Sequence, residues 1–265
     1  MTFDPMGTTA VVTGASSGFG LEFAHRLAER GADLVLVARR ADRLEALAGD
    51  LAQRYGATCT VVPLDLSAPG AAESLASTLA TKKITVSTLV NNAGFGTHGF
   101  VADSDAARLD AEVAVNVSAV VSLTRAFLPG MIAAGNGALV NVASTAGFQP
   151  IPRMAVYGAT KAFVLSFTEA VWWEAKGTGV TVIALCPGPA STEFEDVAHN
   201  ADAMFGRMET AGEVVAAAFR ALDRRDPSPV VITRAFNALN AKMEGFVPRR
   251  ALVNMVARLG APKKK

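Results

Sequence analysis

Seven short runs of apolar and β-branched residues are spaced along the chain. Strands of a parallel sheet are covered on both faces, so each reads as a nearly continuous apolar run rather than an alternating one. The runs therefore predict seven parallel strands. They cover residues 10–13, 34–38, 59–64, 88–91, 139–143, 180–185 and 230–233.

Longer segments with apolar residues at helical spacing lie between these strands. They cover residues 21–30, 43–55, 71–81, 106–133, 155–175 and 211–224. Strand and helix in regular alternation predict right-handed crossovers, and hence an α/β fold with a doubly wound parallel seven-stranded sheet, the Rossmann fold. No linker rich in Pro, Gly or Ser divides this pattern, so we expect residues 1–233 to form a single domain.

A C-terminal helical extension is expected at residues 234–265. Phe236 and Met243 belong to one helical pattern, and Leu252 begins another after Pro248 interrupts the first. The extension holds eight Lys and Arg against one acid, a net charge of +7, whereas residues 1–233 carry −6. Such basic amphipathic helices could cover a cleft, pack on the body or a neighbouring subunit, or rest on an anionic membrane.

The composition is that of a globular protein with a sizeable core. The 265 residues are 51% hydrophobic and 18% charged, which excludes a disordered chain. Lys and Arg (25) nearly balance Asp and Glu (24), so we expect no nucleic-acid partner. Cys59 and Cys186 lie in strand-like runs and predict buried reduced thiols. The three His residues are widely spaced and have no Cys partners, so no metal site is expected.

The N-terminal segment argues for a cytoplasmic protein. Asp4 stands where a signal peptide requires Lys or Arg. No uninterrupted apolar stretch reaches the roughly 20 residues that cross a bilayer. Membrane association is therefore expected only at the surface, through the basic extension.

A glycine-rich turn follows the first predicted strand. Glycine permits positive φ angles and leaves no Cβ in the way of a pyrophosphate, which would bind at the start of the next helix. A purely structural turn would use the same residues, but the position between the first strand and the first helix favours cofactor binding. The candidate residues are Gly14, Ser16, Ser17, Gly18, Phe19 and Gly20.

Arg39 follows the second predicted strand, where a fold of this kind that prefers NAD carries a carboxylate. A carboxylate would repel a 2′-phosphate, whereas a guanidinium can bind it, so Arg39 favours NADP(H) over NAD(H). Ser16 is a second candidate donor to that phosphate. The alternative is that Arg39 and Arg40 only form a solvated helix start, although cations are disfavoured there.

Tyr157 and Lys161 lie four residues apart in a predicted helix and share one face. An ammonium beside a phenol stabilises the phenolate and should draw its pKa down from about 10. A hydride-transfer site needs such a group to exchange a proton with the substrate oxygen. Ser144, at the end of the fifth predicted strand, supplies a hydroxyl for the same oxygen, although an isolated Tyr and Lys at this spacing could be an ordinary surface pair.

The chain from Thr13 to about Thr233 resembles the compact, single-domain branch of the short-chain dehydrogenase/reductase family. The extended branch is similar in its Tyr and Lys but differs in glycine spacing. The motifs that carry the resemblance are Thr13-Gly14-x3-Gly18-x-Gly20, Asp65, Asn91-Asn92-Ala93-Gly94, Asn116, Ser144, Tyr157-x3-Lys161 and Pro187-Gly188.

The resemblance implies four catalytic roles. Tyr157 would be the general acid in carbonyl reduction and the base in alcohol oxidation, and Ser144 would polarise the carbonyl. Lys161 would bind the nicotinamide ribose and lower the pKa of Tyr157. Asn116 would hold a water that links Lys161 to solvent.

The resemblance also implies contacts with the cofactor. Asp65 would contact the adenine amine, with Leu66 beside it. Asn92 has two possible roles, a contact with the ribose or a structural link between adjacent strands. The ribose-lining residues would be Asn92, Ala93 and Gly94, and the nicotinamide would be held by Pro187, Gly188 and Thr192.

Apolar residues near these motifs indicate a hydrophobic substrate, unless they belong to the core. A segment after the sixth strand could close as a lid. The lid residues would be Phe194, Met204, Phe205 and Met208, and the neighbouring apolar residues are Phe95, Phe148 and Ile151.

The family commonly pairs the helices at 106–133 and 155–175 across a two-fold axis. The second of these helices carries enough large apolar surface to make a homodimer or homotetramer plausible. The residues concerned are Phe163, Phe167, Trp172 and Trp173.

These features predict an NADP(H)-dependent oxidoreductase that interconverts a ketone or aldehyde and an alcohol on a hydrophobic small molecule. One alternative is a non-catalytic NADP(H)-binding regulatory protein, which would not need the Tyr157 and Lys161 pair. Another is a lyase or isomerase on the same fold.

Overall fold

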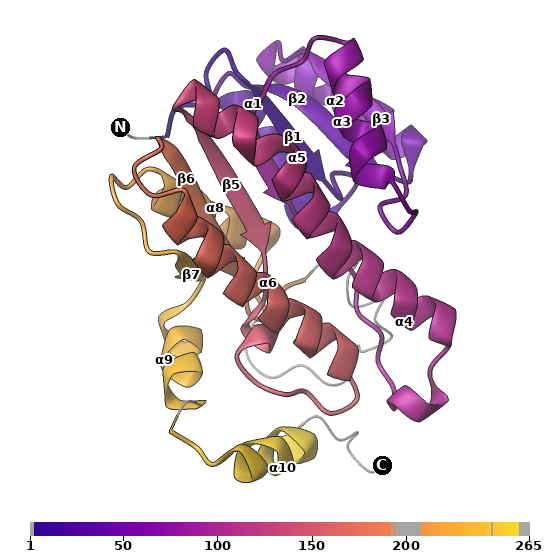
Figure 1. The fold of residues 1–265 in the computed structure, drawn as a ribbon, viewed down its shortest axis with the longest axis vertical. Coiled ribbons are helices and arrows are strands. Elements are labelled where there is room, and N and C mark those ends of the chain that lie inside the picture. The colour runs from indigo at the N-terminus through magenta and orange to yellow at the C-terminus, as the bar shows by residue number, and fades with distance from the viewer. Residues whose placement is uncertain (1–2, 192, 194–207, 245, 260–265) are drawn as a thin grey trace.

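The apolar runs form a single parallel sheet in the computed structural model, which describes residues 3–191, 193, 208–244 and 246–259 (Figure 1). The strand order is β3-β2-β1-β4-β5-β6-β7, and every neighbouring pair is parallel. This confirms the predicted seven-stranded Rossmann sheet. The strands are β1 (Thr9–Thr13), β2 (Asp33–Ala38), β3 (Cys59–Pro63), β4 (Val86–Asn91), β5 (Gly137–Val142), β6 (Val180–Cys186) and β7 (Val230–Ile232).

Helices cover both faces of the sheet, close to the predicted positions. The left-handed residues Gly56 and Gly135 end two of them, α2 and α5. The helices are α1 (Gly18–Glu29), α2 (Ala41–Tyr55), α3 (Ala71–Thr81), α4 (Ala106–Val113), α5 (Ala119–Ala134), α6 (Ala155–Glu174) and α8 (Ala211–Leu222), with short 3₁₀ turns at Val101–Asp103 and Thr145–Gly147.

Alternate residues of each strand supply the two halves of the core. Val12 and Val140 pack with α1, α2 and α8 on one face of the sheet. Their neighbours Val11 and Leu139 pack with α3, α5 and α6 on the other. Figure 1 shows α5 and α6 crossing this second face. With both faces covered, the carboxyl-terminal edge of the sheet is where loops can form a binding cleft.

The predicted helix at 106–133 is interrupted near its middle. α4 and α5 are joined by a π-helical turn, Ala114–Ser118, which contains Asn116. The combined helix, Ala106–Ala134, is the one among the described residues that could cross a membrane by length and composition. Leu123 and Phe127 are buried against the sheet, so we assign this helix to the sheet-covering layer.

The C-terminal extension forms two helices, as predicted. These are α9 (Ala235–Glu244) and α10 (Arg249–Leu259), and they lie beyond the sheet at the bottom of Figure 1. Leu252 on α10 is fully buried, whereas Phe236 on α9 and Phe246 between the helices are 69% and 84% exposed. The extension therefore packs through part of its apolar surface and exposes the rest.

Candidate active site

A cleft of about 1180 Å³ opens at the carboxyl-terminal edge of the sheet. Most residues predicted from the sequence line it, whereas Gly20 and Asn116 do not, and Thr192 lies outside the described residues. The predicted residues in the lining are Gly14, Ser16, Ser17, Gly18, Phe19, Arg39, Asp65, Leu66, Asn92, Ala93, Gly94, Ser144, Tyr157, Lys161, Pro187 and Gly188. The fold thus brings together motifs that are far apart in the chain.

The glycine turn between β1 and α1 is packed too closely for larger residues. Gly14 has φ +65°, and a Cβ there would lie 2.8 Å from the Asn92 amide nitrogen. A Cβ on Gly20 would lie 2.3 Å from the Gly14 carbonyl oxygen. Gly14 and Gly18 therefore present bare backbone to the cleft near the start of α1, which is the kind of surface that a pyrophosphate needs.

Asn92 ties β4 to the glycine turn. Its side-chain amide donates to the Thr13 carbonyl at 2.8 Å, and its backbone N–H donates to the Thr13 hydroxyl at 2.9 Å. Of the two roles considered for Asn92, the structure shows the structural one. A ribose contact from Asn92, Ala93 or Gly94 remains a prediction.

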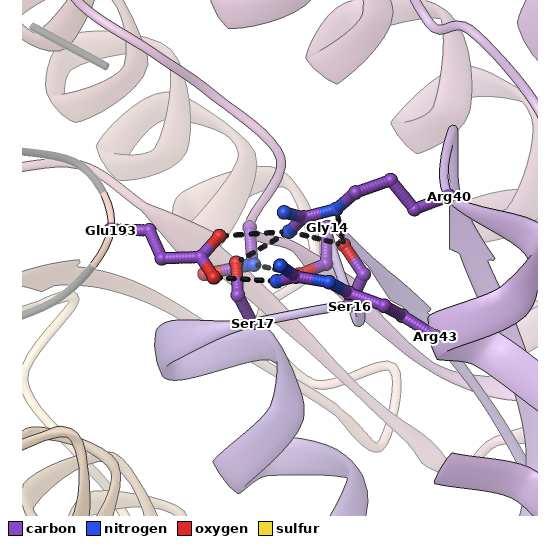
Figure 2. Close-up of polar contacts among 7 residues, drawn as sticks. Gly14, Ser16, Ser17, Arg40, Arg43 and Glu193 are labelled. Carbon is purple, nitrogen blue, oxygen red and sulfur yellow. Dashed lines mark hydrogen bonds and ion pairs between the residues drawn. The ribbon is translucent and has the colours of Figure 1, made fainter. Parts of the chain in front are cut away.

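Arg40, rather than Arg39, faces the glycine turn. The Arg40 Nη2 donates to the hydroxyls of Ser16 at 2.9 Å and Ser17 at 3.2 Å (Figure 2). Arg39 is exposed at the rim of the cleft, near enough to Asp65 to help lower the pKa of that carboxyl. The geometry therefore favours Arg40 over the predicted Arg39 as the contact for a 2′-phosphate.

Two further charged residues complete this cluster. Arg43, in the first turn of α2, donates to Glu193 at 2.5 Å, and Arg40 donates to the other oxygen of the same carboxylate at 2.9 Å. Sequence reasoning missed Arg43 and Glu193. Arg40 and Arg43 are three residues apart, a spacing that places side chains on one side of a helix and could have indicated an anion site.

Asp65 is held by the chain that follows it. Its carboxylate accepts hydrogen bonds from the Ser67 backbone N–H at 2.9 Å and the Ser67 hydroxyl at 2.7 Å, which hold the pKa of Asp65 below its usual range. The neighbouring Leu66 is buried. Asp65 is therefore an ionised acceptor in the cleft lining, and its contact with the adenine amine remains a prediction.

Tyr157 and Lys161 lie one turn apart on α6, as predicted. The Lys161 Nζ is 5.8 Å from the centre of the Tyr157 ring and donates to the Val142 carbonyl at 2.7 Å. Ser144 begins the 3₁₀ turn after β5 and forms a hydrogen bond with Tyr157. Three groups from β5 and α6 thus meet in the cleft.

The pKa of Tyr157 differs from the expectation. The pKa is raised to about 12, mainly by burial; the hydrogen bond with Ser144 opposes this rise, and the negative charge of Glu112 contributes to it. Lys161 does not draw the pKa down, because burial outweighs the attraction of charge in this pocket. The same burial lowers the pKa of Lys161 to about 8.

Asn116 is fixed behind the cleft wall by the π-helical turn. It accepts from the Phe95 N–H at 3.1 Å and donates to the Phe95 carbonyl at 2.9 Å and the Thr160 hydroxyl at 3.1 Å. A Cβ on Gly94 would lie 2.9 Å from the Asn116 oxygen and 3.5 Å from the Lys161 Nζ. Asn116 and Lys161 therefore approach the same glycine, and π-helical turns are often found at functional sites.

Glu112 is a buried acid that sequence reasoning missed. It is fully buried on α4, one turn before Asn116. Burial raises its pKa, while Thr97, Arg108 and Lys161 lower it. The spacing of Glu112 and Asn116, four residues apart, places both side chains on one face of the helix and could have indicated a shared polar site.

Another part of the cleft lining is mainly apolar and includes residues of the C-terminal helices. Phe95 and Ile151 line the cleft as predicted, whereas Phe148 packs in the core. Met208 lies outside the lining, and the other expected lid residues, Phe194, Met204 and Phe205, fall outside the described residues. Residues of the C-terminal extension also line the cleft, which agrees with one of the roles expected for the extension. They include Phe236, Asn237, Asn240, Met243, Val247, Leu252, Met255 and Val256.

The α9 helix reaches the nicotinamide end of the predicted cofactor site. A Cβ on Gly188 would lie 2.4 Å from the Asn237 amide nitrogen, so only glycine leaves room for this contact. Leu252 on α10 is both fully buried and part of the lining. The extension therefore covers one side of the cleft.

Comparisons with known proteins agree with this geometry. Residues 8–202 match the family model of the short chain dehydrogenases. Sulfoacetaldehyde reductase 2 of Chromohalobacter salexigens is 41% identical over 191 residues, which cover 71% of this chain and 75% of that protein. The very-long-chain 3-oxoacyl-CoA reductase of Bos taurus is 32% identical over 72% of this chain and 62% of its own length.

Solved structures show the same fold. A short-chain dehydrogenase from Sphingobium yanoikuyae in complex with NADPH has a TM-score of 0.80 and 34% identity, over 90% of this chain and 94% of that one. A structure of 7β-hydroxysteroid dehydrogenase has a TM-score of 0.85 and 28% identity, over 97% of this chain and 99% of that one. The second match extends over nearly the whole chain, so the likeness is not confined to the region of the family model.

Proposed function

Because this chain belongs to the short-chain dehydrogenase family, we propose that it is an NADP(H)-dependent oxidoreductase that interconverts a ketone or aldehyde and an alcohol on a hydrophobic small molecule. The family and its reductases make the chain an oxidoreductase of C=O and CH–OH groups. The cofactor preference and the nature of the substrate are the proposal. The observation that carries it is that Tyr157, Ser144 and Lys161 meet in the same cleft as the glycine turn.

The residues of the cleft fit a dinucleotide. Gly14 and Gly18 present bare backbone to the cleft, and Arg40, Ser16 and Ser17 form a cluster of donors beside them. NADP(H), when bound, supplies or accepts the hydride. Asp65, which lines the cleft, would contact the adenosine, and Pro187 and Gly188, also in the lining, would contact the nicotinamide. The Sphingobium yanoikuyae structure holds NADPH, which supports the same cofactor here.

Ser144 and Tyr157 would act together on the substrate oxygen. Their hydroxyls are hydrogen-bonded to each other, so a carbonyl oxygen could accept from both. With a pKa of about 12, Tyr157 keeps its proton at neutral pH. It can therefore donate that proton to the oxygen as hydride adds to the carbonyl carbon, which favours the direction of reduction.

Lys161 would return the proton to Tyr157. Its pKa of about 8 is close to neutral, which suits a group that must both hold and release a proton. Asn116 keeps its place behind Gly94 through bonds to Phe95 and Thr160 and so positions this side of the site. The proton would reach Lys161 from solvent through water near Asn116.

The apolar lining supports a hydrophobic substrate. Phe95, Ile151 and Leu252 come from three different parts of the chain and converge on the cleft. The relatives are named for sulfoacetaldehyde, a 3-oxoacyl-CoA and a hydroxysteroid, so they support a carbonyl or alcohol substrate without choosing among these classes.

An activity screen of the full-length protein tests the proposal. Ketones and aldehydes of increasing hydrocarbon content would be offered with NADPH or NADH, and cofactor oxidation followed by absorbance. We expect reduction of hydrophobic carbonyls with NADPH and slower reduction with NADH. No turnover of any carbonyl or alcohol in either direction would contradict the proposed function.

Exposed aromatic residues on α6 support a homodimer or homotetramer. Trp173 is 71% exposed and Phe163 41%, whereas Phe167 and Trp172 pack partly on the core. Pairing of α6 across a two-fold axis would cover the exposed rings. A monomeric mass in light scattering at micromolar concentration would contradict this state.

We place the protein in the cytoplasm, with surface contact to anionic membranes through the extension. Phe246 is exposed and is followed three and four residues later by the exposed Arg249 and Arg250, a combination of apolar and basic side chains typical of interfacial helices. Co-sedimentation with vesicles of anionic lipid at low salt tests this contact. Absence of binding would leave packing on the cleft as the role of the extension.

A further inference from the structure

Glu193 links the segment after β6 to two arginines on the opposite side of the glycine turn. One carboxylate oxygen accepts from Arg40 at 2.9 Å and the other from Arg43 at 2.5 Å. The same Arg40 nitrogen donates to Ser16 and Ser17. Figure 2 shows the carboxylate of Glu193 facing both guanidinium groups, with Ser16 and Ser17 beside them. An anion supplied by the protein itself therefore occupies this cluster of donors.

We propose that Glu193 is a specificity-determining residue that competes with the 2′-phosphate of NADP(H) for Arg40 and Arg43. The inference rests on the proposed use of NADP(H) and adds a residue that weakens that preference. NADP(H) must displace the carboxylate to reach the two arginines. NAD(H), which carries a hydroxyl at this position, has no comparable need to displace it.

The charges of the cluster support a competition between anions. Hydrogen bonds from Arg43 and Arg40 hold the pKa of Glu193 below its usual range, so the side chain is ionised at neutral pH. One carboxylate opposite two guanidinium groups leaves a net positive charge. A phosphate has more charge and a third acceptor oxygen, so it matches two arginines and two hydroxyls better than a carboxylate does.

The exposure of the three side chains allows this exchange. Glu193 is 43% exposed, Arg40 40% and Arg43 45%. Ion pairs in contact with solvent are weak and are screened by salt. Glu193 should therefore reduce the affinity for NADP(H) without excluding it, and the reduction should shrink as the salt concentration rises.

Binding of two small probes to full-length Glu193→Gln isolates the effect. The probes are 2′,5′-ADP, which carries the 2′-phosphate, and 5′-AMP, which does not, and both are measured by titration calorimetry. At low salt, we expect 2′,5′-ADP and NADPH to bind Glu193→Gln about three- to tenfold more tightly than they bind the wild type. The affinities for 5′-AMP and NADH should stay within about twofold.

Asp223→Asn is the matched control. Asp223 is also 43% exposed and also pairs with an arginine, Arg30, but it does not line the cleft. The variant removes one negative charge of equal exposure, so it reports the general effect of net charge. We expect it to leave the ratio of NADPH to NADH affinity at the wild-type value.

A combined variant tests whether the effect passes through the two arginines. In the Arg40→Ala Arg43→Ala background, Glu193→Gln should no longer tighten 2′,5′-ADP binding by more than about twofold. If Glu193→Gln increased the affinity for 2′,5′-ADP as much in this background as in the wild type, the proposal would be overturned, because Glu193 would then not act through Arg40 and Arg43. An unchanged NADPH to NADH ratio in the Glu193→Gln single variant, or weaker NADPH binding, would also overturn it.

These outcomes differ from a failure of the proposed function. If the wild type binds neither NADPH nor 2′,5′-ADP, both proposals fail. If it binds NADPH, and Arg40→Ala weakens that binding while Glu193→Gln has no effect, only the role of Glu193 fails.

Discussion

The Lys161 ammonium lies 5.8 Å from the centre of the Tyr157 ring and donates to the carbonyl of Val142, the last residue of β5. The bond fixes the position of the ammonium relative to the sheet edge, where Ser144 follows two residues later. The helix α6 therefore positions Tyr157 and Lys161, and the end of β5 positions Ser144 and holds the Lys161 ammonium.

Tyr157→Phe should lower kcat by roughly 10²- to 10⁴-fold, because the general acid is lost while the shape of the ring is kept. NADPH affinity should stay within about twofold of the wild type. Steady-state kinetics and a binding titration measure the two effects. Tyr55→Phe is the control, since Tyr55 is the other tyrosine of the chain and does not line the cleft. Retained turnover in Tyr157→Phe would remove the acid role.

Arg40→Ala should weaken NADPH binding about tenfold, since charge-assisted hydrogen bonds to a phosphate are lost. NADH binding should change by no more than about twofold. Arg39→Ala, made in parallel, should have the smaller effect because Arg39 lies at the exposed rim near Asp65. A larger loss of NADPH affinity in Arg39→Ala than in Arg40→Ala would instead support Arg39, the residue predicted from the sequence, as the contact for the 2′-phosphate.

Folding stability should rise with pH through the titration of Lys161. Burial lowers the pKa of Lys161 to about 8 in the folded state. Between pH 8 and 10 the unfolded chain therefore binds more protons than the folded one, and the free energy of unfolding increases with pH. Lys161→Met removes this contribution.

Urea denaturation at pH 8 and pH 10 measures this contribution. The free energy of unfolding of the wild type relative to Lys161→Met should grow by about 2–3 kcal/mol over that range. Lys176→Met, at an exposed position after α6, should show no such growth. The same slope in both variants would mean that Lys161 titrates normally.

Glu112→Gln should move the pH profile of alcohol oxidation to lower pH. The negative charge of Glu112 raises the pKa of both Tyr157 and Lys161, so its removal lowers both and makes the Tyr157 phenolate available at lower pH. Glu174→Gln, exposed at the end of α6, is the control. A profile that stays in place or moves to higher pH would show that Glu112 does not act on the pair.

Gly94→Ala should reduce kcat about tenfold or more. The added Cβ would lie 2.9 Å from the Asn116 oxygen, and three hydrogen bonds hold Asn116 in place. Overpacking of this kind also costs about 1–3 kcal/mol of stability, which thermal unfolding would detect. Gly130→Ala on α5 meets nothing within 4 Å and should be neutral or stabilising. Equal behaviour of the two variants would contradict a role for Gly94 in positioning Asn116.

The sheet could be predicted because each strand is covered on both faces and reads as an apolar run. The π-helical turn at Asn116 could not, because five residues are too few to distinguish its period from that of an α-helix. Its position depends on hydrogen bonds to Phe95 and Thr160, which are partners from other parts of the fold. The sequence pattern correctly predicted that Asn116 lies in the helix at 106–133, but it did not show which hydrogen bonds fix its side chain.

The choice between Arg39 and Arg40 illustrates a second limit. The two residues are adjacent, and the one that faces the glycine turn depends on where β2 ends and α2 begins, at Ala38 and Ala41. The direction in which the pKa of Tyr157 shifts also depends on the three-dimensional structure and not on the local sequence. The spacing to Lys161 predicts attraction between charges, whereas the degree of burial, set by tertiary packing, decides the sign.

The buried position of Leu252 has a consequence for how this enzyme can diversify. The match to the family model ends at residue 202, and the groups that we propose act on the substrate oxygen all precede that point. The helices α9 and α10 come later in the chain and form part of the cleft wall. The C-terminal segment can therefore vary in length and side chains while the reaction machinery stays constant. A chimera that exchanged residues 234–265 between two members of the family would change the shape of the cleft and leave the reacting groups unchanged.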